Sequence, residues 1–149
     1  MSQENVEIVR STLAAIERAI ASYWRTPHSM AEEVEAGAPE FEEAMGFLDP
    51  GIVWNAGDLG SSRGREQLAA LLDDLLEIAD AYEISVIEIR EGDGDLVYAA
   101  IDRAITAKGS GIEMAIRVFI TFRIENGLIA QMDEYLDHQE ALEAAGLEE

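Results

Sequence analysis

The 149-residue sequence contains no cysteine, and only 10 lysine and arginine residues stand against 31 aspartates and glutamates. The absence of cysteine excludes disulfide bonds, thiol nucleophiles and cysteine-ligated zinc within the chain. The formal net charge of -21 repels phosphate backbones and anionic lipid headgroups. We therefore expect neither nucleic acid nor a membrane surface as a partner.

Long apolar runs and metal-binding motifs are also missing. No run approaches the roughly 20 residues that a membrane-spanning helix needs, and the opening MSQENVEIVR lacks a basic segment followed by an apolar core. On these grounds we expect a cytoplasmic protein. The two histidines, His28 and His138, are far apart and do not form a metal-ligand spacing. No metal or other cofactor is expected.

The first half of the chain has helical periodicity. One long amphipathic helix that ends near Pro27 is predicted from apolar residues three or four positions apart, namely Val6, Val9, Leu13, Ile16, Ile20 and Tyr23. A short helix is predicted from about Pro39 to Leu48, and a longer one over RGREQLAALLDDLLEIADAY, residues 63–82. Between them, GIVWN, residues 51–55, predicts a short strand.

After residue 82 the apolar pattern alternates. Turn signals at Asp93-Gly94, Gly109 and Asn126-Gly127 predict three hairpins that join four antiparallel strands. The expected strands cover about 83–91, 95–107, 112–125 and 128–137. A last helix is predicted in DHQEALEAAGL, with Asp137 as N-cap and Gly146 as the stop. Helices followed by long strands indicate an α+β fold, a cone in which a curved antiparallel sheet wraps around the N-terminal helices.

The order of several segments resembles SnoaL-like proteins of the nuclear transport factor 2-like, or ketosteroid isomerase-like, superfamily, which have a cystatin-like cone. The resemblance lies in ENVEIVRSTLAAI, FLDPGIVWN, SSRGREQLAALL, GDLVYAAI, ENGLIAQMDEYLD and HQEALEAAGL. It implies a single domain over residues 1–149, with an insertion at about 22–40 that could cover the open end of the cone. Because this superfamily includes polyketide cyclases, isomerases, epoxide hydrolases, dehydratases and non-catalytic domains, the fold alone does not give the function.

The resemblance places the functional cavity on the concave face of the sheet. Strand alternation then predicts a mostly apolar lining by Val53, Asn55, Val97, Ala99, Ile101, Arg103, Ile116, Val118, Ile120, Phe122, Ala130, Met132 and Glu134. The polar members of this set are Asn55, Arg103 and Glu134. We predict these three as the candidate catalytic residues.

The superfamily's known catalytic patterns are only partly present. Ketosteroid isomerases have a carboxylate base near the position of Asn55 and a protonated acid near that of Ile120, so their proton shuttle is absent here. SnoaL-type cyclases have a histidine near Ile120 and an acid near Glu134, and only the acid remains. Against limonene epoxide hydrolases, Glu134 and Asn55 match in type, but a tyrosine, an arginine and a second carboxylate are replaced by Val53, Ile101 and Arg103.

Two functions stay open. In the first, the protein binds a small, largely apolar molecule with one polar group, and Glu134 acts as a base or orients water, with Arg103 as its partner and Asn55 as an anchor. That chemistry would be of the isomerase, cyclase or hydrolase type without a metal. In the second, the domain is a non-catalytic binding or dimerisation module, and Arg103 and Glu134 form a structural ion pair. The distance between Arg103 and Glu134 distinguishes a fixed anion from a free base.

The convex face of the sheet is unusually apolar for a surface exposed to water. It consists of small and aromatic side chains, Tyr98, Ala100, Ala104, Ala115, Phe119, Thr121 and Tyr135. A solvated face would alternate more strongly to polar residues, so we expect this face to meet a second copy of the chain in a homodimer.

Overall fold

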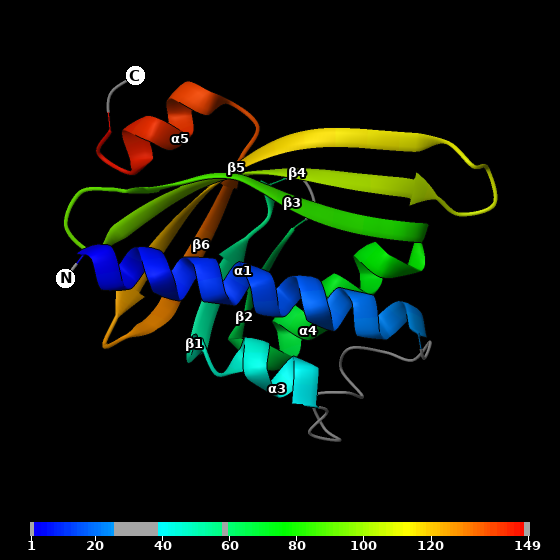
Figure 1. Ribbon diagram of the computed structural model, residues 1–149, viewed down its shortest axis with the longest axis horizontal. Coiled ribbons are helices and arrows are strands. Elements are labelled where there is room, and N and C mark those ends of the chain that lie inside the picture. Colours follow the sequence, from blue (N-terminus) through cyan, green and yellow to red (C-terminus); the bar gives the residue numbers. More distant parts are fainter. Residues whose placement is uncertain (1, 26–38, 58–59, 148–149) are drawn as a thin grey trace.

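The computed structural model describes residues 2–25, 39–57 and 60–147 (Figure 1). The helices are α1 (Ser2–Arg25), α3 (Pro39–Met45), α4 (Gly64–Glu77) and α5 (His138–Ala144). The strands are β1 (Leu48–Asn55), β2 (Ser61–Arg63), β3 (Ala79–Glu91), β4 (Leu96–Ala107), β5 (Glu113–Glu125) and β6 (Leu128–Tyr135). Residues 26–38 lie outside the described part, and most of the insertion expected at about 22–40, with the cover it was expected to form, falls on them. In that part, no helix combines the length and the apolar character needed to cross a membrane.

The six strands form one curved, open sheet in the order β2-β1-β6-β5-β4-β3. Helices α1, α3 and α4 lie on one side of it and α5 lies on the other (Figure 1). The predicted α+β fold is confirmed. The sheet is not wholly antiparallel as predicted, because β1 runs parallel to β6 while all the other pairs are antiparallel.

The main core lies between the three helices and the concave face. The apolar stripe of α1 contributes Val9 and Leu13, and the middle of the sheet contributes Ile101 and Phe122, all of them buried. Alternation places the strand residues on one face of the sheet, and spacing by three or four residues places the helix residues on one side of α1. The core therefore follows from these two periodicities of the sequence.

Helix α4 ends five residues earlier than its periodicity predicts, at Glu77. The following residues join the sheet, where Tyr82 pairs with Ile105 and the Ile78 carbonyl accepts the N–H of Lys108 at 3.0 Å. The helical spacing of Ile78 and Tyr82 was therefore misleading, because backbone pairing with β4 outweighs helix propensity at the end of a helix. As a result, Tyr82 belongs to the concave face.

The hairpin turns lie where the sequence predicts them. Gly94, Gly109, Asn126 and Gly127 all have positive φ, between 52° and 77°. Positive φ is the conformation that tight hairpin turns need and that most side chains resist. The three-residue strand β2 was not predicted. It pairs with the end of β1 and completes the sheet edge.

Helix α5 covers part of the convex face. Its N-cap is Asp137, as predicted, whose side chain accepts the N–H of Glu140 at 3.0 Å. Tyr98 and Ala100, which we expected to meet a second subunit, are instead buried under this helix, against Ala141, Leu142 and Ala145. The apolar character of this half of the face is thus explained within the chain.

Candidate functional site

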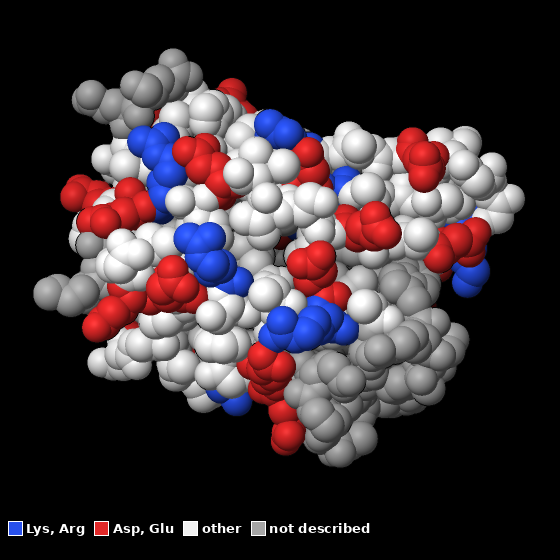
Figure 2. Space-filling view, viewed as in Figure 1, with Lys and Arg blue, Asp and Glu red and all other residues white. Residues whose placement is uncertain are grey.

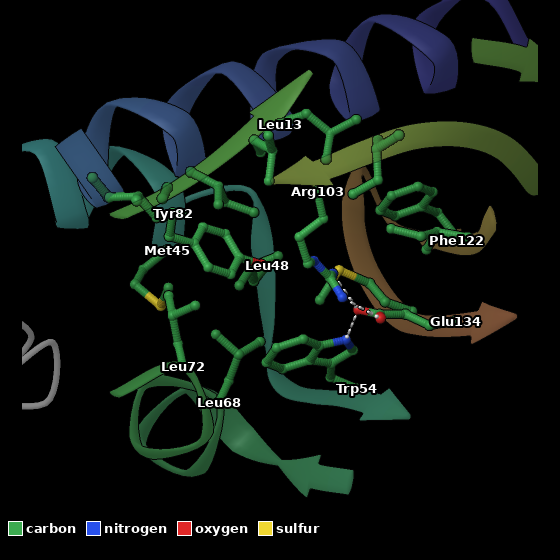
Figure 3. A pocket seen from close by; sticks show the side chains of 18 residues that line it. Leu13, Met45, Leu48, Trp54, Leu68, Leu72, Tyr82, Arg103, Phe122 and Glu134 are labelled. Atoms are coloured by element: carbon green, nitrogen blue, oxygen red, sulfur yellow. Dashed lines mark hydrogen bonds and ion pairs between the residues drawn. The ribbon is translucent and has the colours of Figure 1, made fainter. Parts of the chain in front are cut away.

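A cavity of about 70 Å³ lies between the helices and the concave face of the sheet (Figure 3). Side chains of α1, α3, α4 and every strand except β2 line it, and almost all of them are aliphatic or aromatic. Its volume is well below the roughly 300–1,000 Å³ of typical ligand pockets. The cone is therefore filled mostly by its own side chains, including the predicted Ile101, Ile120, Phe122 and Met132.

At the polar end of this cavity Arg103 and Glu134 form a two-pronged ion pair. Nη1 donates to Oε1 and Nη2 donates to Oε2, both at 3.1 Å. The two side chains are only 8% and 6% exposed. Arg103 comes from β4 and Glu134 from β6, so the arginine reaches across β5, which lies between these strands. The structure thus brings together two predicted residues whose distance the sequence leaves open. Their catalytic roles stay predictions.

Trp54 is the third member of this cluster. Its indole Nε1 donates to Oε2 of Glu134 at 2.7 Å (Figure 3). Strand β1 carries the indole into the cavity because Trp54 lies beside Met132 in the parallel pairing with β6. Sequence reasoning missed Trp54, although it is the residue of GIVWN that combines a large apolar surface with a hydrogen-bond donor.

The prediction that Val53 and Asn55 line the cavity is wrong. Asn55 lies beside Asp133 in the pairing of β1 with β6, on the opposite face from Trp54. Its Nδ2 donates to Oδ1 of Asp133 at 2.6 Å, and Gln131 donates to the same carboxylate. Because a strand's side chains alternate, a register error of one residue moved both predicted residues to the wrong face. Among the described residues, the donors to Glu134 are Trp54 and Arg103 and do not include Asn55.

Glu134 is held as a fixed anion. Its Oε1 accepts one hydrogen bond and its Oε2 accepts two. An ionised carboxylate has about four lone-pair positions, so one position, on Oε1, is left for a further donor. The short distances between the Arg103 nitrogens and the Glu134 oxygens keep the carboxylate ionised and in place. They therefore favour a Glu134 that orients a bound group over a Glu134 that takes a proton from carbon.

Two hydrogen-bonding groups lie beside this anion. Within the described residues, the buried Nε–H of Arg103 has no hydrogen-bond acceptor. Tyr82, from β3, lines the cavity and interacts with the same guanidinium. Burial raises the pKa of Tyr82 to about 12, against the opposing effect of Arg103. Its hydroxyl is therefore neutral at ordinary pH and can donate a hydrogen bond. Sequence reasoning missed Tyr82 because it assigned this residue to a helix.

A second hollow, which we call the outer groove, also reaches the ion pair. It has a volume of about 410 Å³, and its lining includes Arg103 and Glu134 together with Ile116, Val118 and residues near the start of α5. Ile116 and Val118 were predicted to line the same cavity as Phe122, but they face this groove instead. They lie nearer the start of β5 than Phe122, where Ile116 pairs with Arg103 and Val118 pairs with Ile101. The ion pair is thus a wall that the inner cavity and the outer groove share.

No metal site is evident in the described ranges, because no three histidine, aspartate or glutamate side chains gather closely enough to hold an ion.

Comparisons with known proteins agree with this fold. Solved structures similar to the chain include an NTF2-like protein from Burkholderia thailandensis, at 20% identity and TM-score 0.67, with 93% of this chain and 96% of that chain covered. An LEH-like epoxide hydrolase from M. tuberculosis is 18% identical with TM-score 0.62 and coverages of 96% and 90%. A putative polyketide cyclase from Xanthomonas campestris is 17% identical with TM-score 0.64 and 93% coverage of both chains.

No curated protein matches the sequence at a significant level. Residues 28–132, however, match the SnoaL-like domain family. This match spans more than half of the chain, and the structural neighbours share its cone of helices and curved sheet. The chain therefore belongs to the SnoaL-like domain family, within the NTF2-like and ketosteroid isomerase-like fold.

Proposed function

We propose that the protein binds a small, largely apolar molecule in the inner cavity, with one polar group of that molecule against the Arg103–Glu134 pair. The observation that carries this proposal is a buried, fully formed ion pair at the polar end of an otherwise apolar cavity. Such sites combine an apolar lining with a few polar groups that orient the ligand.

The hydrogen-bonding groups around the pair define the polar group of the ligand. The Nε–H of Arg103 and the hydroxyl of Tyr82 are donors, and Oε1 of Glu134 has one acceptor position left. A ketone, ether or epoxide oxygen matches the two donors, and an alcohol also matches the acceptor. A carboxylate is disfavoured because it would lie beside the charge of Glu134.

The ligand must enlarge the cavity when it binds. The free volume of about 70 Å³ is small for an organic molecule. Two lining residues, Met45 and Met132, have flexible, unbranched side chains that repack at low cost. Binding with displacement of these methionines reconciles the small cavity with an organic ligand.

For a reaction at this site, the geometry favours water activation over proton abstraction. The free position on Oε1 of Glu134 would hold one water molecule next to a ligand oxygen polarised by Tyr82 and Arg103. An epoxide hydrolase-like protein is among the structures of similar fold, and its name is compatible with such chemistry. At 18% identity it supports the fold alone.

The alternative is a non-catalytic module in which the pair only stabilises the cone. The observation that favours it is that three hydrogen bonds from the chain itself already occupy most of the acceptor positions of Glu134. Removing one partner of such a buried pair destabilises the protein whether or not a ligand binds there. The experiment must therefore separate ligand binding from stability.

A thermal-shift screen with small neutral ketones, alcohols and epoxides tests the proposal on the wild type, Glu134→Gln and Asp102→Asn. Asp102 is the matched control, because it also forms a two-pronged pair, with Arg117 at 2.7 and 3.0 Å, but on the exposed face. We expect a ligand-dependent rise in Tm that changes in Glu134→Gln and persists in Asp102→Asn. If no compound raises Tm and Glu134→Gln only melts earlier, the non-catalytic, structural reading replaces the proposal.

A further inference from the structure

The outer groove differs from the inner cavity in size and in exposure. Its volume of about 410 Å³ lies within the range of typical ligand pockets. Leu136 and Ile116, both in its lining, are 70% and 39% exposed, so apolar surface is left open to solvent there. Exposed apolar surface inside a concave site is typical of a binding groove.

Carboxylates also line the outer groove. Asp137 and Glu140, at the start of α5, line the groove together with Glu134. Among the described residues of the lining, Arg103 is the one basic side chain, and Glu134 already neutralises it. The carboxylate of Asp137 is held in place, because its Oδ1 caps α5 by accepting the N–H of Glu140. Among the described residues, neither Asp137 nor Glu140 forms an ion pair with a basic side chain, so both carboxylates keep their negative charge beside an apolar wall.

We propose that the outer groove is a second ligand site and that its occupant is a compact organic cation, an ammonium group on an apolar body. The ammonium group lies near Asp137 and Glu140, and the body packs against Ile116, Val118 and Leu136. The net charge of -21 attracts such a ligand from a distance. An anion is repelled, and a neutral analogue gains only the apolar contact. The proposal does not depend on the ligand proposed for the inner cavity, although the two sites share Arg103 and Glu134.

The acidic surface as a whole also attracts cations, so the test must distinguish a local site from the general field. Figure 2 shows acidic side chains spread over the face it presents, with basic ones between them. The variants Asp137→Asn and Glu140→Gln each remove one charge from the groove, and asparagine can still cap α5. Glu143→Gln removes the same charge from an exposed position of α5 that does not line the groove.

Isothermal titration of the intact protein with benzyltrimethylammonium measures these effects, with benzyl alcohol and benzenesulfonate as neutral and anionic comparators. We expect binding of the cation alone, weakened by about two- to fivefold in Asp137→Asn and Glu140→Gln and unchanged in Glu143→Gln. Leu136→Ala, at a largely exposed position, is expected to weaken binding without loss of Tm. Backbone NMR shifts should centre on Ile116, Leu136 and Glu140.

Three results would overturn the proposal. Equal weakening by all three charge variants would mean that only the general field attracts the cation. Equal affinity for benzyl alcohol would mean that the carboxylates contribute nothing. No binding of the cation at about millimolar concentration would leave the groove without the proposed ligand class.

Discussion

Trp54 donates its indole N–H to Glu134 at 2.7 Å, across the one parallel strand pairing of the sheet. The same carboxylate receives both terminal nitrogens of Arg103. Three strands, β1, β4 and β6, are thereby joined at one buried anion. The ligand-binding and stability properties predicted below depend on this cluster.

The Trp54→Phe variant removes the neutral donor and keeps most of the ring. Hydrogen bonds to charged groups contribute about 1.5–3 kcal/mol, so we expect the free energy of unfolding to fall by roughly that amount. Urea denaturation followed by circular dichroism measures the change. A loss of less than about 0.5 kcal/mol would show that the indole N–H contributes little in solution.

Removing one partner of the buried pair should lower the free energy of unfolding more than removing both partners. Glu134→Leu leaves an uncompensated guanidinium, and we expect it to destabilise the protein by about 3–5 kcal/mol. The double variant Arg103→Met, Glu134→Leu replaces the pair by apolar side chains and should recover most of this loss. Urea denaturation of the single and double variants provides the comparison.

The control for this prediction is Arg117→Met, which breaks the exposed pair with Asp102. Exposed pairs contribute at most about 1 kcal/mol, so the control should change the free energy of unfolding by no more than that amount. Losses of equal size for Glu134→Leu and Arg117→Met would mean that burial does not govern the energetics of these pairs.

Tyr82 should make stability depend on alkaline pH. Its pKa is raised by burial from 10.0 to about 12, so the folded state holds the hydroxyl proton more tightly than the unfolded state. Its contribution is complete below pH 10 and is lost as pH rises through about 12, with a slope of up to roughly 1.4 kcal/mol per pH unit. The difference in unfolding free energy between wild type and Tyr82→Phe, measured from pH 8 to pH 12, isolates the contribution of the Tyr82 hydroxyl. A difference that does not vary with pH would contradict it.

The homodimer stays a prediction. The part of the convex face that is free for it is smaller than the sequence suggested, because α5 covers Tyr98 and Ala100. Helix α5 leaves Ala104 and Ala115 of the convex face exposed. Each chain carries a net charge of -21, so association should strengthen as salt screens the repulsion. Sedimentation velocity at low salt and at about 0.3 M salt tests this, with Ala115→Glu expected to favour the monomer. A wild-type monomer at micromolar concentration in the higher salt would contradict the prediction.

Much of the fold could be read from the sequence because it depends on local periodicity. The alternation in β5 and the turn at Asn126-Gly127 identify the faces and the hairpin without tertiary information. The same alternation, together with the family's fold, predicted that Arg103 and Glu134 both lie on the concave face, but their direct contact could not be read from the sequence. The end of α4 could not be read, because pairing with β4 decides the conformation of Tyr82.

The misplacement of Val53 and Asn55 and the omission of Trp54 have one cause, the register of a short strand. GIVWN has apolar residues on both faces, so alternation alone does not say whether Trp54 or Asn55 points inward. The pairing of Trp54 with Met132 and of Asn55 with Asp133 decides it. The role of α5 was missed for a related reason, because a short helix gives no local sign of which face of a sheet it covers.

The most direct test of the proposed function is an NMR titration of protein labelled with ¹³C at the methionine methyl groups. Met45 and Met132 line the inner cavity, whereas Met114 is exposed on β5 and serves as an internal control. With a small neutral ketone or epoxide that raises Tm, we predict saturable shifts of the Met45 and Met132 methyl signals and an unchanged Met114 signal, with altered affinity in Glu134→Gln. Shifts confined to Met114, or no saturable shift of Met45 and Met132, would contradict binding in the inner cavity.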